Sequence, residues 1–275
     1  MSVQKWALVL GASSGFGGAT SIALAEAGYN IIGIHLDRQI TLPKVNQIIK
    51  KIEKAGRQAV FFNMNAADSI KRNDTLDELK ERFLTKEHPH VHVVLHSLAF
   101  GTLKPYISKN PNDCITQAQM QMTLDVMAHS LVYWVQGLVQ RDLLAVGARI
   151  FGLTSAGSQT VIPSYGAVSA AKASLESHIR QLAVELASMR VTANAIMAGV
   201  TDTPALAKIP GNEKMLESAK LKNPSGRLTT PEDIGKAIVL LCDEKADWIT
   251  GNVIQVDGGE FIVNYTGEKT LRHIK

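Results

Sequence analysis

Seven short apolar segments recur along the chain, with helical patterns between them, and this alternation restricts the fold more than any other feature. Most of the segments are apolar at every residue rather than at every second one, and they cover residues 6–10, 31–34, 59–62, 91–95, 150–153, 191–196 and 253–256. Continuously apolar strands are typical of parallel sheets that are buried on both faces. The alternation therefore predicts an α/β fold in which a seven-stranded parallel sheet has helices on both faces.

Length and composition fit one soluble domain. The 275 residues are 45% hydrophobic, and no Pro- or Gly-rich linker divides them, so we expect a domain over residues 1–265 and a polar tail over 266–275. No apolar run approaches the roughly 18 residues of a membrane span, and we expect no signal peptide before the first strand. The net charge is only +4, and Cys114 and Cys242 lie far apart. We predict a cytoplasmic protein with no disulfide, metal site, membrane anchor or nucleic-acid partner.

A glycine-rich loop joins the first predicted strand to the first helix, with the sequence Gly11-Ala-Ser-Ser-Gly-Phe-Gly17. Glycines permit a tight turn and a close approach to a pyrophosphate, while the helix N-terminus offers free N–H groups and a positive dipole end. Three glycines alone would also fit a plain structural turn. With the flanking strand and helix they predict a single Rossmann-type doubly wound domain that binds a dinucleotide. The predicted contacts are Gly11, Ser13, Ser14, Gly15, Phe16 and Gly17.

The segment after the second strand, His35-Leu-Asp37-Arg38, bears on the choice of cofactor. An acid in this region binds the ribose hydroxyls of NAD, whereas an arginine accommodates the 2′-phosphate of NADP. Asp37 lies about two residues later than the usual NAD-selecting acid, so NADP(H) is favoured slightly over NAD(H). Ser14 argues the other way, because many NADP users carry a basic residue at that place. Asp37 and Arg38 could instead form a solvated surface pair.

Tyr165 and Lys172 are the candidate catalytic pair. Six residues separate them, which is close to two helical turns, so both side chains are expected on one helix face. A phenol in water has a pKa of about 10, and a nearby ammonium favours the ionised form, so Lys172 is expected to lower the Tyr165 pKa. Ser155 lies just after the fifth predicted strand, ten residues before Tyr165. Its hydroxyl is placed to donate a second hydrogen bond to a substrate oxygen, or else it merely caps the loop.

The glycine loop and the Tyr165/Lys172 pair together resemble the short-chain dehydrogenase/reductase family over residues 5–263. The resemblance implies that Lys172 also hydrogen-bonds the nicotinamide ribose. It implies further cofactor contacts in the loops after the third, fourth and sixth strands: Asn65, Ala66, Ser97, Leu98, Ala99, Gly199, Val200, Thr201 and Thr203. The turn Val256-Asp-Gly-Gly259 closes the last strand as it commonly does in this family.

Four features depart from the common family pattern in one direction. They are the wide Tyr165–Lys172 gap, the run His96-Ser-Leu-Ala-Phe100, Asp125 in the fourth helix, and Ala198-Gly199 after the sixth strand. All four are similar to the enoyl-acyl-carrier-protein reductases. The glycine loop and Ser155 look more like the NADPH-using third type of these enzymes. This implies reduction of a trans-2-enoyl thioester by NAD(P)H in fatty-acid synthesis.

The resemblance also implies features of the substrate side and of assembly. A substrate flap is expected at about residues 200–227, and its basic residues form either a docking patch for acyl carrier protein or CoA or a solvated helix face. Those residues are Lys208, Lys214, Lys220, Lys222 and Arg227, against Glu213 and Glu217. Helices over 116–139 and 167–187 are surfaces that the family pairs into homodimers and homotetramers. Alternative functions are a carbonyl or 3-oxoacyl reductase of the same fold and, more remotely, a non-catalytic nucleotide-sensing protein.

Overall fold

A seven-stranded parallel sheet forms the centre of the structure, a computed structural model that describes residues 4–82, 90–209 and 211–264. The spatial order of its strands is β3-β2-β1-β4-β5-β6-β7. The strands are β1 (Trp6–Leu10), β2 (Asn30–His35), β3 (Ala59–Asn63), β4 (Val91–His96), β5 (Leu144–Ser155), β6 (Thr192–Ala198) and β7 (Val253–Val256). All seven predicted strands are present, and the predicted fold class is confirmed.

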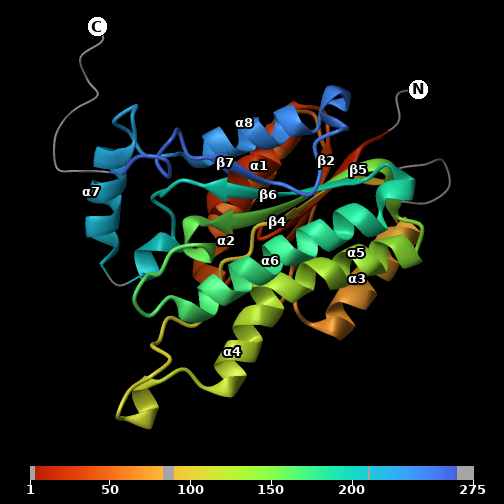
Figure 1. The fold of residues 1–275 in the computed structure, drawn as a ribbon. Coiled ribbons are helices and arrows are strands. Elements are labelled where there is room, and N and C mark those ends of the chain that lie inside the picture. The colour runs from red at the N-terminus through yellow and green to blue at the C-terminus, as the bar shows by residue number, and fades with distance from the viewer. Residues whose placement is uncertain (1–3, 83–89, 210, 265–275) are drawn as a thin grey trace, which may run out of the picture.

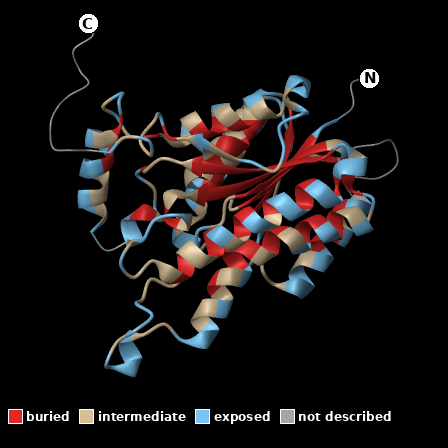
Figure 2. Cartoon of the chain, in the orientation of Figure 1, coloured by how far each residue is buried: buried red, intermediate tan, exposed pale blue. Residues whose placement is uncertain are grey.

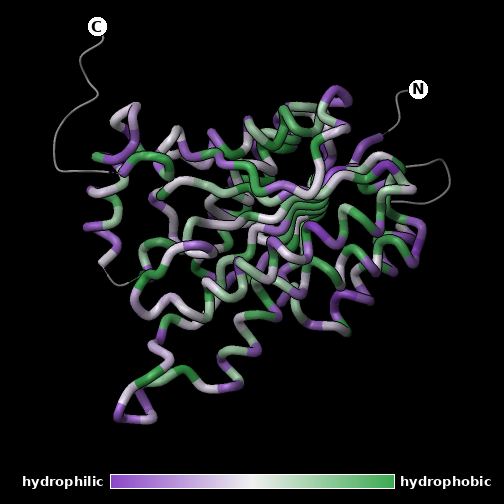
Figure 3. Tube along the Cα trace, in the orientation of Figure 1, coloured by the Kyte–Doolittle hydropathy of each residue, from purple (hydrophilic) through white to green (hydrophobic). Residues whose placement is uncertain are grey.

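Helices cover both faces of the sheet (Figure 1). On one face lie α1 (Gly15–Glu26), α2 (Leu42–Lys54) and α8 (Pro231–Leu241); on the other lie α3 (Ser69–Arg82), α5 (Ser130–Gln140) and α6 (Gly166–Glu185). β1 and β2 are buried at every residue, which explains their continuous apolar sequence. Figure 2 shows the strands as the buried layer between the helices, and Figure 3 shows that the same layer is the most hydrophobic.

Most predicted elements differ from the observed ones by only a residue or two at their ends, but one helix and one strand differ more. The helix expected over residues 116–139 is broken into α4 (Gln117–Leu124), a π-helical turn η3 (Asp125–His129) and α5. Asp125 therefore lies on the π-helical turn, where it is exposed. β5 begins at Leu144, well before the predicted strand at 150–153.

The carboxyl ends of the strands meet at one edge of the sheet, because all the pairings are parallel. The strand order reverses between β1 and β4, and ligands of such sheets bind at this crevice. Beyond this edge, at the left of Figure 1, lie the short helix η6 (Leu206–Lys208) and α7 (Asn212–Lys222), which belong to the segment expected to form the flap. The expected tail, 266–275, lies outside the described residues.

Candidate active site

Close backbone contacts hold the glycine-rich loop. Gly11 has a φ of +94°, and a Cβ at this position would lie 2.5 Å from the Ser97 carbonyl oxygen. A Cβ on Gly17 would lie 2.1 Å from the Gly11 carbonyl oxygen. Gly15, with a φ of +52°, faces the Thr203 side chain, 3.7 Å from its would-be Cβ. The loop thus brings the exits of β1 and β4 and the start of α1 into a cradle that any larger residue would fill.

The N-terminus of α1 can receive an anion. Ser14 precedes the helix with an extended backbone, and its side chain makes no capping hydrogen bond. First-turn N–H groups of a helix have no partner within it, and the dipole makes this end positive. The uncapped N–H groups and the tight loop therefore fit the pyrophosphate of a dinucleotide. Thr203 lies across the loop from Gly15 and can add a hydroxyl.

Asp37 is fixed beside the glycine loop. Its Oδ2 lies 3.0 Å from His35 Nδ1, and its backbone exchanges two 2.9 Å hydrogen bonds with the Asn63 side chain. Burial acts to raise the pKa of Asp37, but hydrogen bonds led by the one from the Ser13 hydroxyl outweigh it and lower the pKa. Arg38 is exposed, and it forms no ion pair with Asp37 in the described residues. The surface-pair alternative is therefore wrong.

The loops after β3 and β4 lie at the same edge. Ala66 is buried, and its carbonyl accepts a 2.9 Å hydrogen bond from Trp134 Nε1, while Asn65 is exposed. The Ser97 N–H donates to the Leu10 carbonyl at 2.8 Å, which ties the β4 exit to β1. Leu98 lies next to Gly11, Phe16 packs against the core of the α1 face, and Ala99 is exposed. These places suit the predicted contacts with a dinucleotide.

The loop after β6 is held by Glu260, a residue that the sequence analysis did not single out. Glu260 Oε2 accepts a 3.1 Å hydrogen bond from the Val200 N–H. A Cβ on Gly199 would lie 3.0 Å from the same oxygen, and Thr201 Oγ1 donates to the Gly199 carbonyl at 3.0 Å. Burial raises the pKa of Glu260. No local pattern marks this residue, because its partner lies 60 positions away in the chain.

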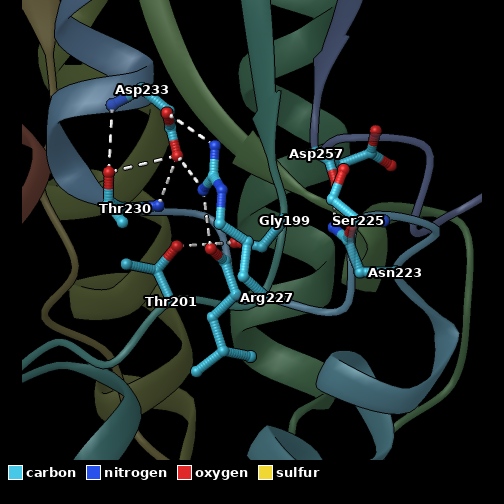
Figure 4. A network of polar contacts seen from close by, with 9 residues as sticks. Gly199, Thr201, Asn223, Ser225, Arg227, Thr230, Asp233 and Asp257 are labelled. Atoms are coloured by element: carbon cyan, nitrogen blue, oxygen red, sulfur yellow. Dashed lines mark hydrogen bonds and ion pairs between the residues drawn. The ribbon is translucent and has the colours of Figure 1, made fainter. Parts of the chain in front are cut away.

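A polar network ties the same turn to the flap (Figure 4). Asp257 is buried, and its carboxylate accepts hydrogen bonds from the backbone N–H groups of Gly259 and Phe261 at 2.9 and 2.8 Å. Asn223, which follows α7, donates from Nδ2 to the Asp257 carbonyl at 2.8 Å. The C-terminal end of the flap helix is therefore anchored to the turn that carries Glu260.

The basic residues of the flap do not form one free patch. Arg227 pairs with Asp233, with a shortest distance of 2.6 Å (Figure 4), so its charge is already engaged. Lys208 lies over the Phe100 ring, 5.9 Å from its centroid. Lys220 and Lys222 lie in the last turn of α7. Lys222 borders a cavity of about 420 Å³ that Glu260 also lines.

Tyr165 and Ser155 meet beside Gly157. A Cβ on Gly157 would lie 2.6 Å from Tyr165 Cε1 and 3.3 Å from Ser155 Oγ. The Ser155 hydroxyl is buried and has no hydrogen-bond partner among the described residues, and it does not cap the short helix that follows. The capping alternative for Ser155 is therefore wrong. A buried unpaired hydroxyl is rare in folded proteins and often marks a ligand site.

The backbone turns sharply just before Tyr165. Ser164 has a φ of +61°, in the left-handed region that non-glycine residues seldom occupy. The Tyr165 N–H donates to the Ile162 carbonyl at 3.1 Å, which closes the turn. This turn directs the tyrosine ring over Gly157 and toward Ser155.

Lys172 lies two turns further along α6 and is buried. Its Nζ donates a 2.7 Å hydrogen bond to the Leu153 carbonyl. Burial lowers the pKa of Lys172 from 10.5 to about 8, partly opposed by Glu176. Burial also raises the pKa of Tyr165, and the nearby Ser155 hydroxyl opposes this to a smaller extent, although the two hydroxyl groups do not meet the geometry of a hydrogen bond. The expectation that Lys172 lowers the Tyr165 pKa is wrong for this structure, in which the phenol is protonated at neutral pH.

His96 is a core residue rather than a reacting group. Its Nε2 lies 2.9 Å from Ser130 Oγ, and Ser130 donates its own hydrogen to the Val126 carbonyl at 2.9 Å. Ser130 must therefore accept from Nε2–H, which fixes the tautomer of His96. Burial, followed by the charge of Lys172, lowers the pKa of His96 to about 3, so the ring is neutral.

Other kinds of site are not found in the described part of the chain. Within residues 4–82, 90–209 and 211–264, no three His, Cys, Asp or Glu side chains gather in a way that could hold a metal ion. Cys114 and Cys242 are both free thiols. In the same residues, no helix has the length and apolar character needed to span a bilayer.

The known proteins that resemble this chain include several reductases. A family model described as Enoyl-(Acyl carrier protein) reductase matches residues 11–260. The chain is 27% identical over 241 residues to the NADH-dependent enoyl-[acyl-carrier-protein] reductase of Aquifex aeolicus, covering 86% of this chain and 85% of the relative. It is 25% identical over 273 residues to versicolorin reductase 1 of Dothistroma septosporum, covering 94% and 96%.

The crystal structure of the Aquifex aeolicus reductase is similar in fold. It superposes with a TM-score of 0.80 at 24% sequence identity, over 95% of this chain and 98% of that one.

Proposed function

Because this chain belongs to the enoyl-(acyl carrier protein) reductase family, we propose that it reduces the C=C bond of a trans-2-enoyl thioester with a reduced nicotinamide dinucleotide. The observation that carries the proposal is the buried, unpaired hydroxyl of Ser155 beside the protonated phenol of Tyr165. Both side chains lie beside Gly157, and Ser155 is paired in the sheet with Ala198 at the end of β6. Such an arrangement suits an oxygen on which negative charge develops during reaction.

The residues of this chain would act as follows. A bound dinucleotide would supply the hydride to the β-carbon, and the α-carbon would then take its proton from Tyr165 or water. Tyr165 donates a hydrogen bond to the thioester oxygen, where charge appears as an enolate forms, so it stabilises the transition state more than the ground state. Ser155 donates a second hydrogen bond to the same oxygen. Lys172 uses one N–H on the Leu153 carbonyl and has others left for the ribose hydroxyls of the dinucleotide.

The choice between NADH and NADPH is the finer part of the proposal. The sequence favours NADP(H) slightly, through Arg38 and the late position of the acid. The contacts of Asp37 support NADH instead, because its carboxylate is held against Ser13 of the glycine loop, where it would repel a 2′-phosphate. The name of the Aquifex aeolicus relative also specifies NADH.

The cofactor proposal is tested with two variants. Asp37→Ala should raise the ratio of kcat/KM for NADPH to kcat/KM for NADH by about tenfold. The variant removes a repulsion of about 1.4 kcal/mol between the carboxylate and the 2′-phosphate of NADPH. Arg38→Ala is the matched control and should leave the NADH value unchanged. A wild-type enzyme that prefers NADPH, with a preference lost in Arg38→Ala, would instead assign phosphate binding to Arg38.

The reaction is tested by following absorbance at the reduced-nicotinamide band with crotonyl and acetoacetyl thioesters and both cofactors. Turnover of the crotonyl thioester and not of the acetoacetyl thioester is the expected result. The second candidate, a carbonyl reductase, is favoured by the similarity to versicolorin reductase 1. Turnover of the acetoacetyl thioester alone would establish it. Bound cofactor without turnover of either would support a nucleotide-sensing protein.

We further propose that the thioester arrives on acyl carrier protein or CoA and that the flap provides its docking charge. Lys214, Lys220 and Lys222 of α7 are the candidate residues, whereas Arg227 is paired with Asp233. Assembly into a homodimer or homotetramer through α4, α5 and α6 is also a proposal. Light scattering of the purified protein tests it directly.

A further inference from the structure

Glu176 is a buried acid that the proposed reaction leaves without a role. It lies on α6 one helical turn after Lys172, and only 7% of the residue is exposed. Thr154 Oγ1 donates to Glu176 Oε1 at 2.5 Å, the length of a charge-assisted hydrogen bond. Burying a carboxylate is costly unless a charge or a good donor compensates. The residue therefore calls for an explanation beyond packing.

Lys172 and Glu176 form hydrogen bonds with consecutive residues of β5. Lys172 donates to the Leu153 carbonyl at 2.7 Å, and Glu176 accepts from the Thr154 side chain. The next residue of the strand is Ser155. Two α6 side chains, one turn apart, thus fix the helix that follows Tyr165 to the end of the strand that carries the second donor.

The titratable groups around Lys172 differ in charge and therefore in how they influence the pKa of this lysine. Glu176, on the same helix, raises the pKa of Lys172 against burial. His96 comes from β4 and is neutral, so it contributes no balancing charge. Tyr165 is protonated, and Asp125 on the facing π-helical turn is exposed. Glu176 is the acid whose charge acts on the buried ammonium.

We propose that Glu176 is a positioning residue that acts through Lys172, keeping its ammonium charged and directed toward the cofactor ribose. The inference rests on the proposed function for the role of Lys172. Thr154 completes the arrangement, because its hydroxyl holds the carboxylate at the end of β5, one residue after the Leu153 carbonyl that Lys172 binds.

The test is the pH dependence of kcat for wild type, Glu176→Gln and Glu176→Asp. A lysine loses its charge as pH rises through its pKa, so wild-type turnover should fall above pH 8, where burial and Glu176 together set the pKa of Lys172. Glu176→Gln should move this fall to lower pH by about one unit, since one unit reflects about 1.4 kcal/mol of interaction. At pH 6, where the lysine is charged in both, the two rates should agree within about threefold. Glu176→Asp keeps the negative charge, so its pH profile should lie close to that of the wild type.

Glu185→Gln is the matched control, because Glu185 lies on the same helix and is exposed. It should leave the profile unchanged. A rate lowered by the same factor at every pH in Glu176→Gln, or no change at all, would overturn the proposal. Circular dichroism melting shows whether each variant is folded.

Binding of NADH, followed by its fluorescence between pH 6 and 9.5, gives a readout that needs no enoyl substrate. Glu176→Gln should weaken NADH binding at high pH and leave it close to wild type at pH 6. If the protein reduces no thioester but this shift in binding is seen, the proposed function fails and the role of Glu176 stands. If it reduces thioesters but the shift is absent from both binding and turnover, the role of Glu176 fails alone.

Discussion

The helices α6 and α7 both border the candidate site, but they are attached to the protein very differently. α6 has 20 residues, nine of them buried, and it carries Lys172 and follows directly on Tyr165. α7 has 11 residues, of which only Ala219 is buried. The two candidate catalytic residues, Tyr165 and Lys172, lie at the start of the firmly packed helix and within it. The segment that would admit and cover a substrate stands on the weakly packed one.

The difference follows from sequence. The buried face of α6 includes Leu175, Ile179 and Leu182 at helical spacing, a stripe that packs in the core of this face of the sheet. α7 is polar around most of its surface and is anchored mainly through Asn223 at its C-terminal end. A helix with so little buried surface contributes little to global stability.

The largest expected effect tests this contrast in stability. Leu175→Ala should lower the free energy of unfolding by about 2–5 kcal/mol, because Leu175 is fully buried against the core. Leu221→Ala on α7 should change it by less than about 0.5 kcal/mol, since Leu221 is 43% exposed. Urea denaturation measures both. Equal losses would show that α7 is as firmly packed as α6.

The next effect concerns chemistry on α6. Tyr165→Phe should lower kcat by roughly 100- to 1000-fold, as loss of one donor to a developing oxyanion does. NADH affinity should stay near the wild-type value, because the phenol is assigned to the substrate oxygen. Stopped-flow and steady-state absorbance give both numbers. Turnover within a few-fold of wild type would remove Tyr165 from the mechanism.

A smaller effect is expected at the turn that connects α7 to the loop after β6. Glu260→Ala should raise the KM for NADH by about tenfold, because the Val200 N–H loses its partner and the Gly199–Thr203 loop loosens. Glu260→Gln keeps an acceptor oxygen and should stay within about threefold of wild type. Should both variants lose affinity equally, the carboxylate charge rather than the hydrogen bond is the feature that matters.

The smallest effect concerns the charge of α7. Replacing Lys214, Lys220 and Lys222 together by Gln should raise KM for an acyl carrier substrate by about three- to tenfold and remove most of its salt dependence. The KM for a short N-acetylcysteamine thioester should not change, since it has no acidic carrier. A KM that is independent of salt in the wild type would rule out electrostatic docking.

The sheet was largely predictable from sequence because its five inner strands are mostly buried on both faces. Continuous apolar runs located all seven strands, and β1 and β7 match their predicted bounds. The helix over 116–139 was predicted without its π-helical turn, since one inserted residue in a helical ladder leaves no distinct pattern in the side chains.

The candidate site was predictable only where its residues form local motifs. The glycine loop and the Tyr165/Lys172 pair each lie within a short segment, and the structure brings them to one edge of the sheet. Glu260 contacts Val200 because β7 pairs with β6, and Glu176 contacts Thr154 because α6 packs on β5. The pKa of Tyr165 depends on burial, which the spacing of two residues does not reveal.

The left-handed backbone at Ser164 has a consequence for how this sequence can vary. Glycine, asparagine and aspartate enter that region at little cost, whereas valine, isoleucine and threonine do not. In a library with both neighbours of Tyr165 randomised, position 164 should therefore retain a narrow set of small and polar residues. The residues tolerated at position 164 should therefore reflect the conformation of the backbone rather than the chemistry of the site.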